Sequence, residues 1–502
     1  MTLSAATCRR LALATVTSLV LGTAGALAIA IPVSAATLTV TSTTDDGVGY
    51  TLREAIADAN ASVGVADTID FAGSLLNSTL HINSALIITD TVTISGLGSG
   101  SLSIQRDVGP SSDVFAFQPS STDQDFTVSG ITVQGDNVIT GSGVVANSID
   151  ETPRDVTVID VTFTDLQNGS LGGPAIMVTT ISGTLRVENS RFVSNEGGAS
   201  GGAISAVGVG TAVVLTDDEF IGNEAAGDGG AVYIADTASS VTIQRSTFQA
   251  NVAEGFGGGI YVDQVDLERS LTVDSSTFSA DSTGEFGAAL AIGTVIGEVT
   301  IVNSTLDEGP EDFAMTADLV AGELSVMYST LTGGIYVRTN GGLAEVTSTI
   351  VVQTGGVTIL VDDAVNPVGV LYSILSSWTD SMADMGGNQF GIAPKLGPLQ
   401  DNGGPTFTRM PLADSPAIDR GLPGGTPPTF DQRYTGFPRV IGGRVDVGAV
   451  ETAETAGDVE STRALAATGQ TLNLWIPIIG GVLLLGGAAA IVINVLRRRR
   501  QP

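Results

Sequence analysis

The chain has 502 residues and carries 53 acidic against 21 basic side chains, a formal net charge of −32. Such a charge repels nucleic acid and anionic membrane surfaces, which excludes both as partners. With one cysteine and one histidine, the chain can form neither an internal disulfide nor a metal site rich in Cys or His. Since 43% of its residues are hydrophobic, it should nevertheless fold.

The first 35 residues have the order of a secretory signal peptide. Two arginines at positions 9 and 10 precede an apolar core from 11 to 31, and VSA at 33–35 is an A-x-A-like cleavage site. We expect the mature chain to begin at Ala36. Cys8 precedes the apolar core and would be removed with it, which argues against a lipid anchor on cysteine.

Residues 36–119 are predicted to form an N-terminal cap and the first coils of the fold. Thr51 and Glu54 have the spacing of a capping box, which marks the start of a short helix. The apolar face of this helix should comprise Leu52, Ala55, Ile56 and Ala59. The stretch YTLREAIADANA, followed by DTIDF, resembles the CSLREAI motif of secreted bacterial β-helix proteins, with Tyr50 and Thr51 replacing its cysteine and serine.

The middle of the chain is repetitive. Six strand-like segments end at Phe163, Phe192, Phe220, Phe248, Phe278 and Leu306, at intervals of 29, 28, 28, 30 and 28 residues. Each alternates apolar and polar residues, as a half-buried strand does, and repeats of this length indicate a solenoid. The simplest is a right-handed parallel β-helix whose equivalent residues stack about 4.8 Å apart. We assign residues 120–389 to its repeats.

Small and polar residues recur with the same period. Asn195, Asn223 and Asn251 should form a ladder inside a turn, where their amides bond to one another and avoid the penalty of burial. Tight corners are predicted at the glycine pairs 201–202, 229–230 and 258–259. The F-x-x-N and G-G-A-I patterns resemble the repeats of polymorphic outer-membrane proteins and other pectate-lyase-like β-helices over about residues 120–310. Less regular coils are expected to end near Leu331, Ile350 and Ile374.

Residues 390–451 are rich in turn-forming and charged residues. The strings KLGPLQDNGGPTFTRMPLADSPAID, DQRYTGFPR and VDVGAVE resemble the choice-of-anchor domain that precedes surface anchors in bacteria. The charged positions are Asp401, Asp419, Asp431, Arg433, Arg439, Arg444, Asp446 and Glu451. We interpret them as turn chemistry and ion pairs that close the last coils; the alternatives are a calcium site, since calcium takes oxygen ligands, and an active site. No other cofactor is expected.

A linker, 452–464, leads to a C-terminal sorting signal, 465–502. It contains LAATG at 465–469, a five-residue spacer, an apolar run at 475–496 long enough for one membrane helix, and four arginines that hold the end in the cytoplasm. LAATG resembles the LAxTG signals read by class E sortases of actinobacteria. That resemblance implies recognition through Leu465, Ala466 and Ala467, and cleavage between Thr468 and Gly469. Thr468 would then join an envelope amine or peptidoglycan, which places the protein outside the cell on the wall.

The residue types present exclude most catalytic arrangements. A Ser-His-Asp triad would need His81, for which a structural role is expected. Adjacent strand residues point to opposite faces, so Asp217 and Asp218 should not converge without a bend. A lyase base is lacking among the coils, because Lys395, the single lysine, lies outside them. The carboxylates left for a glycosidase pair are Asp217, Asp218, Glu219, Asp263, Asp266 and Glu268.

Two functional classes remain. The first is a non-catalytic surface protein, a stalk or adhesin that binds glycans or other surfaces. The second is a wall-tethered glycan hydrolase. An exposed aromatic cluster beside carboxylates would favour the second, but the chain has only two tryptophans, Trp378 and Trp475, which argues against a sugar-binding platform. We therefore predict a binding protein without catalytic residues.

Overall fold

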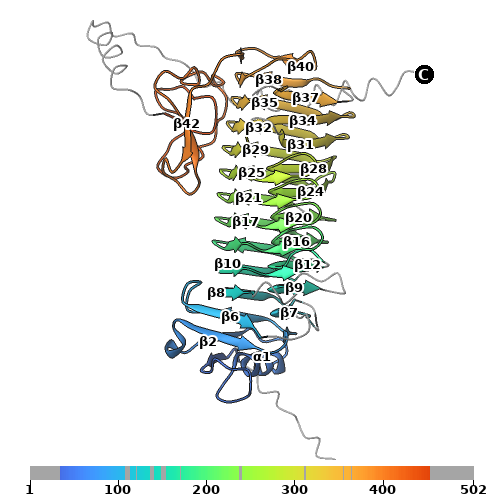
Figure 1. The fold of residues 1–502 in the computed structure, drawn as a ribbon, viewed down its shortest axis with the longest axis vertical. Coiled ribbons are helices and arrows are strands. Elements are labelled where there is room, and N and C mark those ends of the chain that lie inside the picture. Colours follow the sequence, from blue (N-terminus) through green and yellow to red (C-terminus); the bar gives the residue numbers. More distant parts are fainter. Residues whose placement is uncertain are drawn as a thin grey trace, which may run out of the picture.

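The computed structural model describes residues 34–452, except 108–112, 120, 122, 136–140, 148–153, 170, 237–239, 310–312, 354–355 and 363–364. They form an all-β parallel solenoid of the right-handed type with about 11 turns (Figure 1). The predicted solenoid is thereby confirmed. Most coils add two strands to one sheet, separated by a bend, and one strand to a second sheet, so the coils stack as a column.

Three parallel sheets run along the column. The 25-stranded sheet contains β1 (Thr37–Val40), β2 (Asp67–Phe71), β3 (Ser78–Ile82), β5 (Val92–Ser95), β6 (Leu102–Arg106), β8 (Phe126–Gln134), β10 (Val156–Thr164), β13 (Thr184–Glu188), β14 (Arg191–Val193), β17 (Ala212–Thr216), β18 (Glu219–Ile221), β21 (Ser240–Gln244), β22 (Thr247–Gln249), β25 (Ser270–Asp274), β26 (Thr277–Ser279), β29 (Glu298–Val302), β30 (Thr305–Asp307), β32 (Glu323–Met327), β33 (Thr330–Thr332), β35 (Leu343–Thr347), β36 (Ile350–Val352), β38 (Val368–Leu371), β39 (Ile374–Leu375), β40 (Met382–Asp384) and β41 (Gln389–Phe390). The 11-stranded sheet contains β4 (Leu86–Ile88), β7 (Phe115–Phe117), β9 (Val144–Asn147), β12 (Ile176–Thr180), β16 (Ile204–Val207), β20 (Val232–Ala235), β24 (Ile260–Val265), β28 (Leu290–Val295), β31 (Phe313–Leu319), β34 (Gly334–Thr339) and β37 (Ile359–Asp362). The five-stranded sheet contains β11 (Gln167–Asn168), β15 (Glu196–Gly197), β19 (Glu224–Ala225), β23 (Val252–Ala253) and β27 (Ser282–Thr283).

The predicted capping helix covers the N-terminal end. It is α1 (Leu52–Ala61), followed later by the short 3-10 helix η1 (Gly73–Leu75). Thr51 Oγ1 accepts the backbone N–H of Glu54 at 3.2 Å, and Glu54 Oε2 accepts that of Thr51 at 2.9 Å. The buried residues are Leu52, Ala55, Ile56 and Ala59, as predicted. This apolar face shields the first coil, which would otherwise expose core and strand edges.

Phenylalanines fill the interior as a continuous stack. Centroids of consecutive rings from Phe163 to Phe278 lie 5.2, 4.5, 4.6 and 4.5 Å apart. Leu306 and Leu331 continue the column in the next two coils, where β26, β30 and β33 pair in register. The solenoid therefore persists through the less regular repeats, because buried apolar residues still occupy the same register.

Two hydrogen-bonded ladders line the turns. In the predicted one, Asn195 Nδ2 donates to Asn223 Oδ1 and Asn223 Nδ2 to Asn251 Oδ1, both at 2.9 Å. A second ladder, which the sequence analysis missed, lies at the bend within the 25-stranded sheet. In it, the backbone N–H of each residue donates to the side-chain oxygen of the equivalent residue in the next coil. Its members are Ser190, Asp218, Ser246, Ser276, Ser304, Ser329, Thr349 and Ser373.

The glycine corners follow the strand register with one correction. Gly201 and Gly229 have positive φ angles of 80° and 71°, and the next equivalent residue is Gly257, at 68°. The third corner pair is therefore 257–258 rather than 258–259. The sequence GFGGGIYV offered two alignments, and the pairing of Val232 with Ile260 selects the earlier one.

Residues 396–452, which we call the strap, lie along one flank of the upper coils (Figure 1). The strap contains the antiparallel pair β42 (Leu396–Gln400) and β43 (Thr408–Pro411). Thr277 Oγ1 donates to Phe407 O at 2.6 Å, and Gln389 Nε2 donates to Pro416 O at 3.0 Å. We expected this region to close the end of the last coils. Instead it lies along the side of several coils, because hydroxyl and amide side chains on that side of the column form hydrogen bonds with it.

Trp378 and Phe390 lie in the last coils of the column. Their ring centroids lie 4.6 Å apart in an edge-to-face arrangement, and both pack against the hydrophobic core.

Within the described ranges, no helix combines the length and hydropathy that a bilayer crossing needs. The predicted signal-peptide core and the apolar run 475–496 lie outside those ranges.

Candidate functional site

Aromatic side chains gather on the outer face of the 11-stranded sheet. Strand register aligns Tyr233 with Tyr261, and then Ala291, Thr316 and Tyr336 on the following coils. Because alternate residues of a strand share one face, these five positions form one outward column. The column has tyrosines at Tyr261 and Tyr336 and small side chains between them.

The small residues create a hollow, which we call the groove. It has a volume of about 210 Å³, and its floor includes Ala291, Gly293 and Thr316. Any Cβ at Gly293 would lie 2.5 Å from the backbone oxygen of Asp263 and 2.8 Å from the hydroxyl oxygen of Tyr261; the backbone contact cannot be relieved by a side-chain movement, so glycine is required there. Tyr261 and Tyr336 are three coils apart, which makes the groove roughly 14 Å long at the usual strand spacing.

Phenylalanines from the preceding turns form one wall of the groove. Phe256 and Phe286 line the groove and are 37% and 44% exposed, whereas the phenylalanines of the interior stack are fully buried. The ring of Phe286 stacks on Tyr336 with a centroid distance of 5.5 Å, and Phe256 lies 6.4 Å from Tyr261. The wall therefore presents several aromatic surfaces to solvent.

Charged residues form the opposite wall. Arg338 Nη1 lies 3.1 Å from Asp318 Oδ2, and both side chains line the groove. Tyr261 donates its hydroxyl proton to Asp263 at 3.4 Å, and Tyr336 donates to Asp362 at 3.2 Å. Burial, together with the negative charge of Asp263, raises the pKa values of Tyr233 and Tyr261. These phenols therefore stay neutral and can donate hydrogen bonds.

Aromatic faces beside hydrogen-bonding groups suit a sugar, which has apolar C–H faces and polar edges. The low tryptophan count argued against a sugar-binding platform, but the groove exposes aromatic surface built from other residue types. This surface consists of phenylalanine and tyrosine, and Tyr233 and Tyr261 were visible in the repeats GDGGAVYI and GFGGGIYV. Comparing outward positions from coil to coil, instead of counting one residue type, would have found it.

The first group of candidate carboxylates is divided among separate structural contacts. Asp217 pairs with Arg245 and Glu219 with Arg191, each at 2.7 Å. Asp218 is buried in the second ladder, where its two oxygens accept the N–H groups of Ser190 at 2.8 Å and Thr216 at 2.9 Å. As predicted, Asp217 and Asp218 do not converge. Burial raises the pKa of Asp218 well above its usual range, but no substrate can reach it.

The second group separates as well. Asp263 lies beside the groove, Asp266 pairs with Arg269, and Glu268 is exposed on a turn with left-handed backbone. Asp263 belongs to the 11-stranded sheet, whereas Asp218 lies at the bend of the 25-stranded sheet. Asp218 and Asp263, two of the six candidates for a glycosidase pair, are therefore on different faces of the column.

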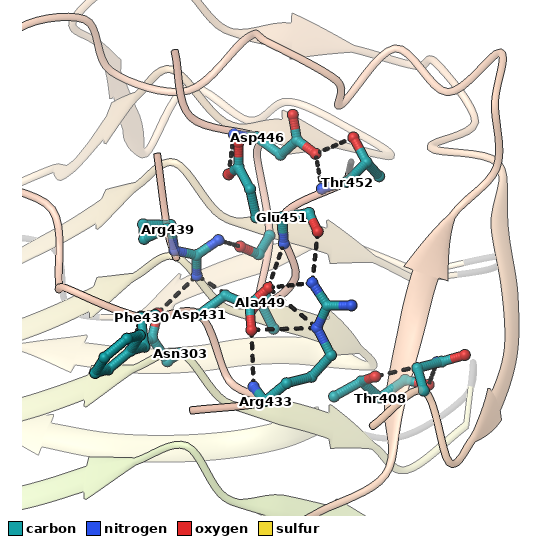
Figure 2. Close-up of polar contacts among 12 residues, drawn as sticks. Asn303, Thr408, Phe430, Asp431, Arg433, Arg439, Asp446, Ala449, Glu451 and Thr452 are labelled. Carbon is teal, nitrogen blue, oxygen red and sulfur yellow. Dashed lines mark hydrogen bonds and ion pairs between the residues drawn. The ribbon is translucent and has the colours of Figure 1, made fainter. Parts of the chain in front are cut away.

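The charged residues of the strap form a buried network (Figure 2). Arg433 Nη2 bonds Asp431 Oδ2 and the carbonyl oxygen of Glu451, both at 2.6 Å. Asp446 accepts the N–H and the hydroxyl of Thr452, both at 2.7 Å. Burial, followed by the nearby Asp446, raises the pKa of Glu451 to about 8.

The other charged residues in the strap, and Lys395 just before it, also serve local contacts. Asp401 accepts the N–H of Gly403 at 2.9 Å, and Asp419 contributes its carbonyl oxygen to Arg444 at 3.3 Å. Lys395 pairs with Asp414. These contacts are the turn and ion-pair chemistry that the sequence predicts.

His81 and the possible metal ligands are the remaining candidate residues. His81 Nδ1 lies 2.8 Å from Asp107 Oδ1 on the next coil, an exposed pair consistent with a structural role. Across the described part of the chain, no three His, Cys, Asp or Glu side chains gather as a metal site would require. The sorting residues Leu465, Ala466, Ala467, Thr468 and Gly469 lie outside the described residues.

No protein-family model and no curated protein matches this sequence. Among solved structures, the fold is similar to that of the pectate lyase Pel9A, with a TM-score of 0.40 and 12% sequence identity. The superposition covers 84% of this chain and 97% of that one.

Proposed function

We propose that this protein is a non-catalytic, extracellular surface protein that binds glycans in the groove. The observation that carries the proposal is the hollow between Tyr261 and Tyr336, walled by the exposed rings of Phe256 and Phe286. Aromatic rings at both ends of a polar-edged groove can stack on successive sugars of one chain. The rest of the column serves as a rigid stalk, since each coil packs only on its neighbours.

Glycan hydrolysis is the alternative, favoured by the carboxylates beside the groove. A glycosidase needs one carboxyl group with a raised pKa as general acid. Burial raises the pKa of Asp218, Asp281, Glu308, Asp446 and Glu451, but these groups are buried in a ladder or in the strap network and do not line the groove. Asp318, which does line the groove, is held by Arg338. Binding is therefore the better-supported function.

Titration calorimetry of the full chain in mild detergent with neutral hexasaccharides of glucose and of N-acetylglucosamine tests this proposal. We expect binding, with affinity about 10- to 100-fold lower for Phe286→Ala and Tyr336→Ala, since each removes an aromatic ring that lines the groove and the two rings stack on each other. Phe407→Ala is the matched control, because Phe407 is 52% exposed on the strap, away from the groove. Unchanged affinity in the groove variants would exclude this site, and release of shorter sugars would favour the hydrolase.

We further propose that a sortase attaches the protein to the cell wall through Thr468. The proposal is supported by the order of LAATG, spacer, apolar run and arginines. In cells that contain a class E sortase, the wild-type chain should resist hot-detergent extraction and be released by wall digestion. Thr468→Ala should move it to the detergent-soluble fraction, whereas Thr471→Ala, three residues further on, should not. Equal wall attachment of both variants would contradict the proposal.

A further inference from the structure

We propose that a second site, in the cavity between the strap and the last coils, binds a small organic anion with one carboxylate. We call this cavity the strap pocket. Its volume of about 580 Å³ is in the usual range for small-molecule sites. It shares no lining residue with the groove, so the proposal does not depend on glycan binding.

Two arginines, Arg420 and Arg444, line the strap pocket from neighbouring segments of the strap. Gly421, which follows Arg420, donates its N–H to the carbonyl oxygen of Val445, which follows Arg444, at 2.8 Å. Arg444 Nη1 donates to the carbonyl oxygen of Asp419, the residue before Arg420, at 3.3 Å. These bonds hold the two arginines on one side of the cavity.

The charges of these arginines are not compensated within the described part of the chain. There, the Arg420 side chain makes no hydrogen bond or ion pair, and the Arg444 side chain bonds a carbonyl oxygen but no carboxylate. Asp419 is the acidic residue of the lining. Asp446, behind it, does not line the pocket and already accepts the N–H groups of Asp419 and Thr452. The lining therefore carries one excess positive charge.

This excess stands out in a chain with 53 acidic and 21 basic side chains. Arginines along the column, such as Arg191 and Arg245, pair with Asp or Glu. Because carboxylates are plentiful on this surface, two guanidinium groups that share one cavity without such a partner are available to an anion from solution.

The remaining lining indicates which kind of anion fits. Tyr372 of the last coils contributes an aromatic ring, and Leu422 and Pro423 of the strap contribute apolar surface. The N–H of Leu422 donates to Ser348 Oγ at 2.9 Å, so this wall is fixed to the column before a ligand arrives. One carboxylate matches the single excess charge, whereas a dianion such as phosphate would also meet Asp419. A sugar acid or an acylated amino acid combines a carboxylate with a compact apolar body.

Ligand-observed NMR titration of the full chain in non-ionic detergent at about pH 7 tests the proposal. The probes are glucuronate and N-acetylalanine, each compared with its neutral amide, and inorganic phosphate. At least one carboxylate should bind about fivefold tighter than its amide, the factor that one partly exposed charge pair can supply. The probe with the larger preference identifies the source as a sugar acid or an amino-acid derivative. Equal binding of acids and amides, tighter binding of phosphate, or no binding by any probe would overturn the proposal.

Arg420→Gln and Arg444→Gln locate the site. Each should lower the affinity for the preferred carboxylate about fivefold and leave that for its amide unchanged. Both side chains are exposed, so neither change should unfold the strap. Arg191→Gln is the matched control, because it removes an exposed arginine from the column. Tyr336→Ala, which alters the groove, should leave carboxylate binding intact. Unchanged affinity in both pocket variants would contradict the assignment, whatever the groove binds.

Discussion

Replacing Arg439 with methionine should detach the strap from the solenoid and cost about 3–5 kcal/mol, the usual penalty for removing one member of a buried charged network. The guanidinium is 0% exposed and donates to Asn303 Oδ1 at 2.6 Å, Tyr328 O at 3.2 Å, Gly448 O at 2.9 Å and Ala449 O at 3.1 Å. Two of these acceptors belong to the coils and two to the strap. Methionine would leave all four without this donor, in a site where water cannot easily replace it.

Hydrogen exchange followed by mass spectrometry measures the effect segment by segment. Amides of the strap should lose protection in the variant, while those around α1 at the far end of the column should keep it. Arg444→Met is the matched control, because Arg444 is exposed and makes one long bond, to the carbonyl of Asp419 at 3.3 Å. If both variants exchanged alike, the docking of the strap would not depend on the buried guanidinium.

The interior of the solenoid was predictable because its residues repeat by identity. Phenylalanine recurs where rings stack and asparagine where amides bond, so spacing alone revealed both columns. The second ladder was missed because serine, threonine and Asp218 fill the same role there. Any short side chain with an oxygen acceptor can accept the N–H of the neighbouring coil. The hydrogen-bonding role therefore repeats although the residue type does not.

The groove and the strap show why surface features were harder to predict. The outward column changes from tyrosine to alanine and threonine and back to tyrosine, and that variation makes the hollow. The strap contacts coils more than 100 residues earlier in the chain, as in the bond from Gln432 to Thr277. No local pattern encodes such contacts. The sequence indicated that the strap's charges would pair with one another but not where the strap would lie.

Raising the pH from about 5 to about 8 should destabilise the protein, and the carboxyl groups at the end of the asparagine ladder should account for much of the loss. Asp281 Oδ1 accepts the N–H and the side-chain amide of Asn251 at 2.7 and 2.9 Å, and the N–H of Asp281 donates to Glu308 Oε2 at 2.7 Å. Burial raises the pKa of Asp281 to about 7, and burial together with Asp281 raises that of Glu308 well above its usual range. In the unfolded chain both groups ionise near pH 4.

The sign follows from proton binding. Between about pH 4 and pH 7 the folded state holds the proton on Asp281 and the unfolded state does not, so the free energy of unfolding falls as pH rises, by up to about 1.4 kcal/mol per pH unit for one group. Asp281→Asn should flatten this fall and raise the melting temperature at pH 8, because asparagine continues the ladder without a charge. Thermal unfolding across this pH range, with Glu298→Gln as an exposed control, measures the difference. An equally steep decline in Asp281→Asn and wild type would show that the ladder carboxyl group is ionised in the folded protein throughout.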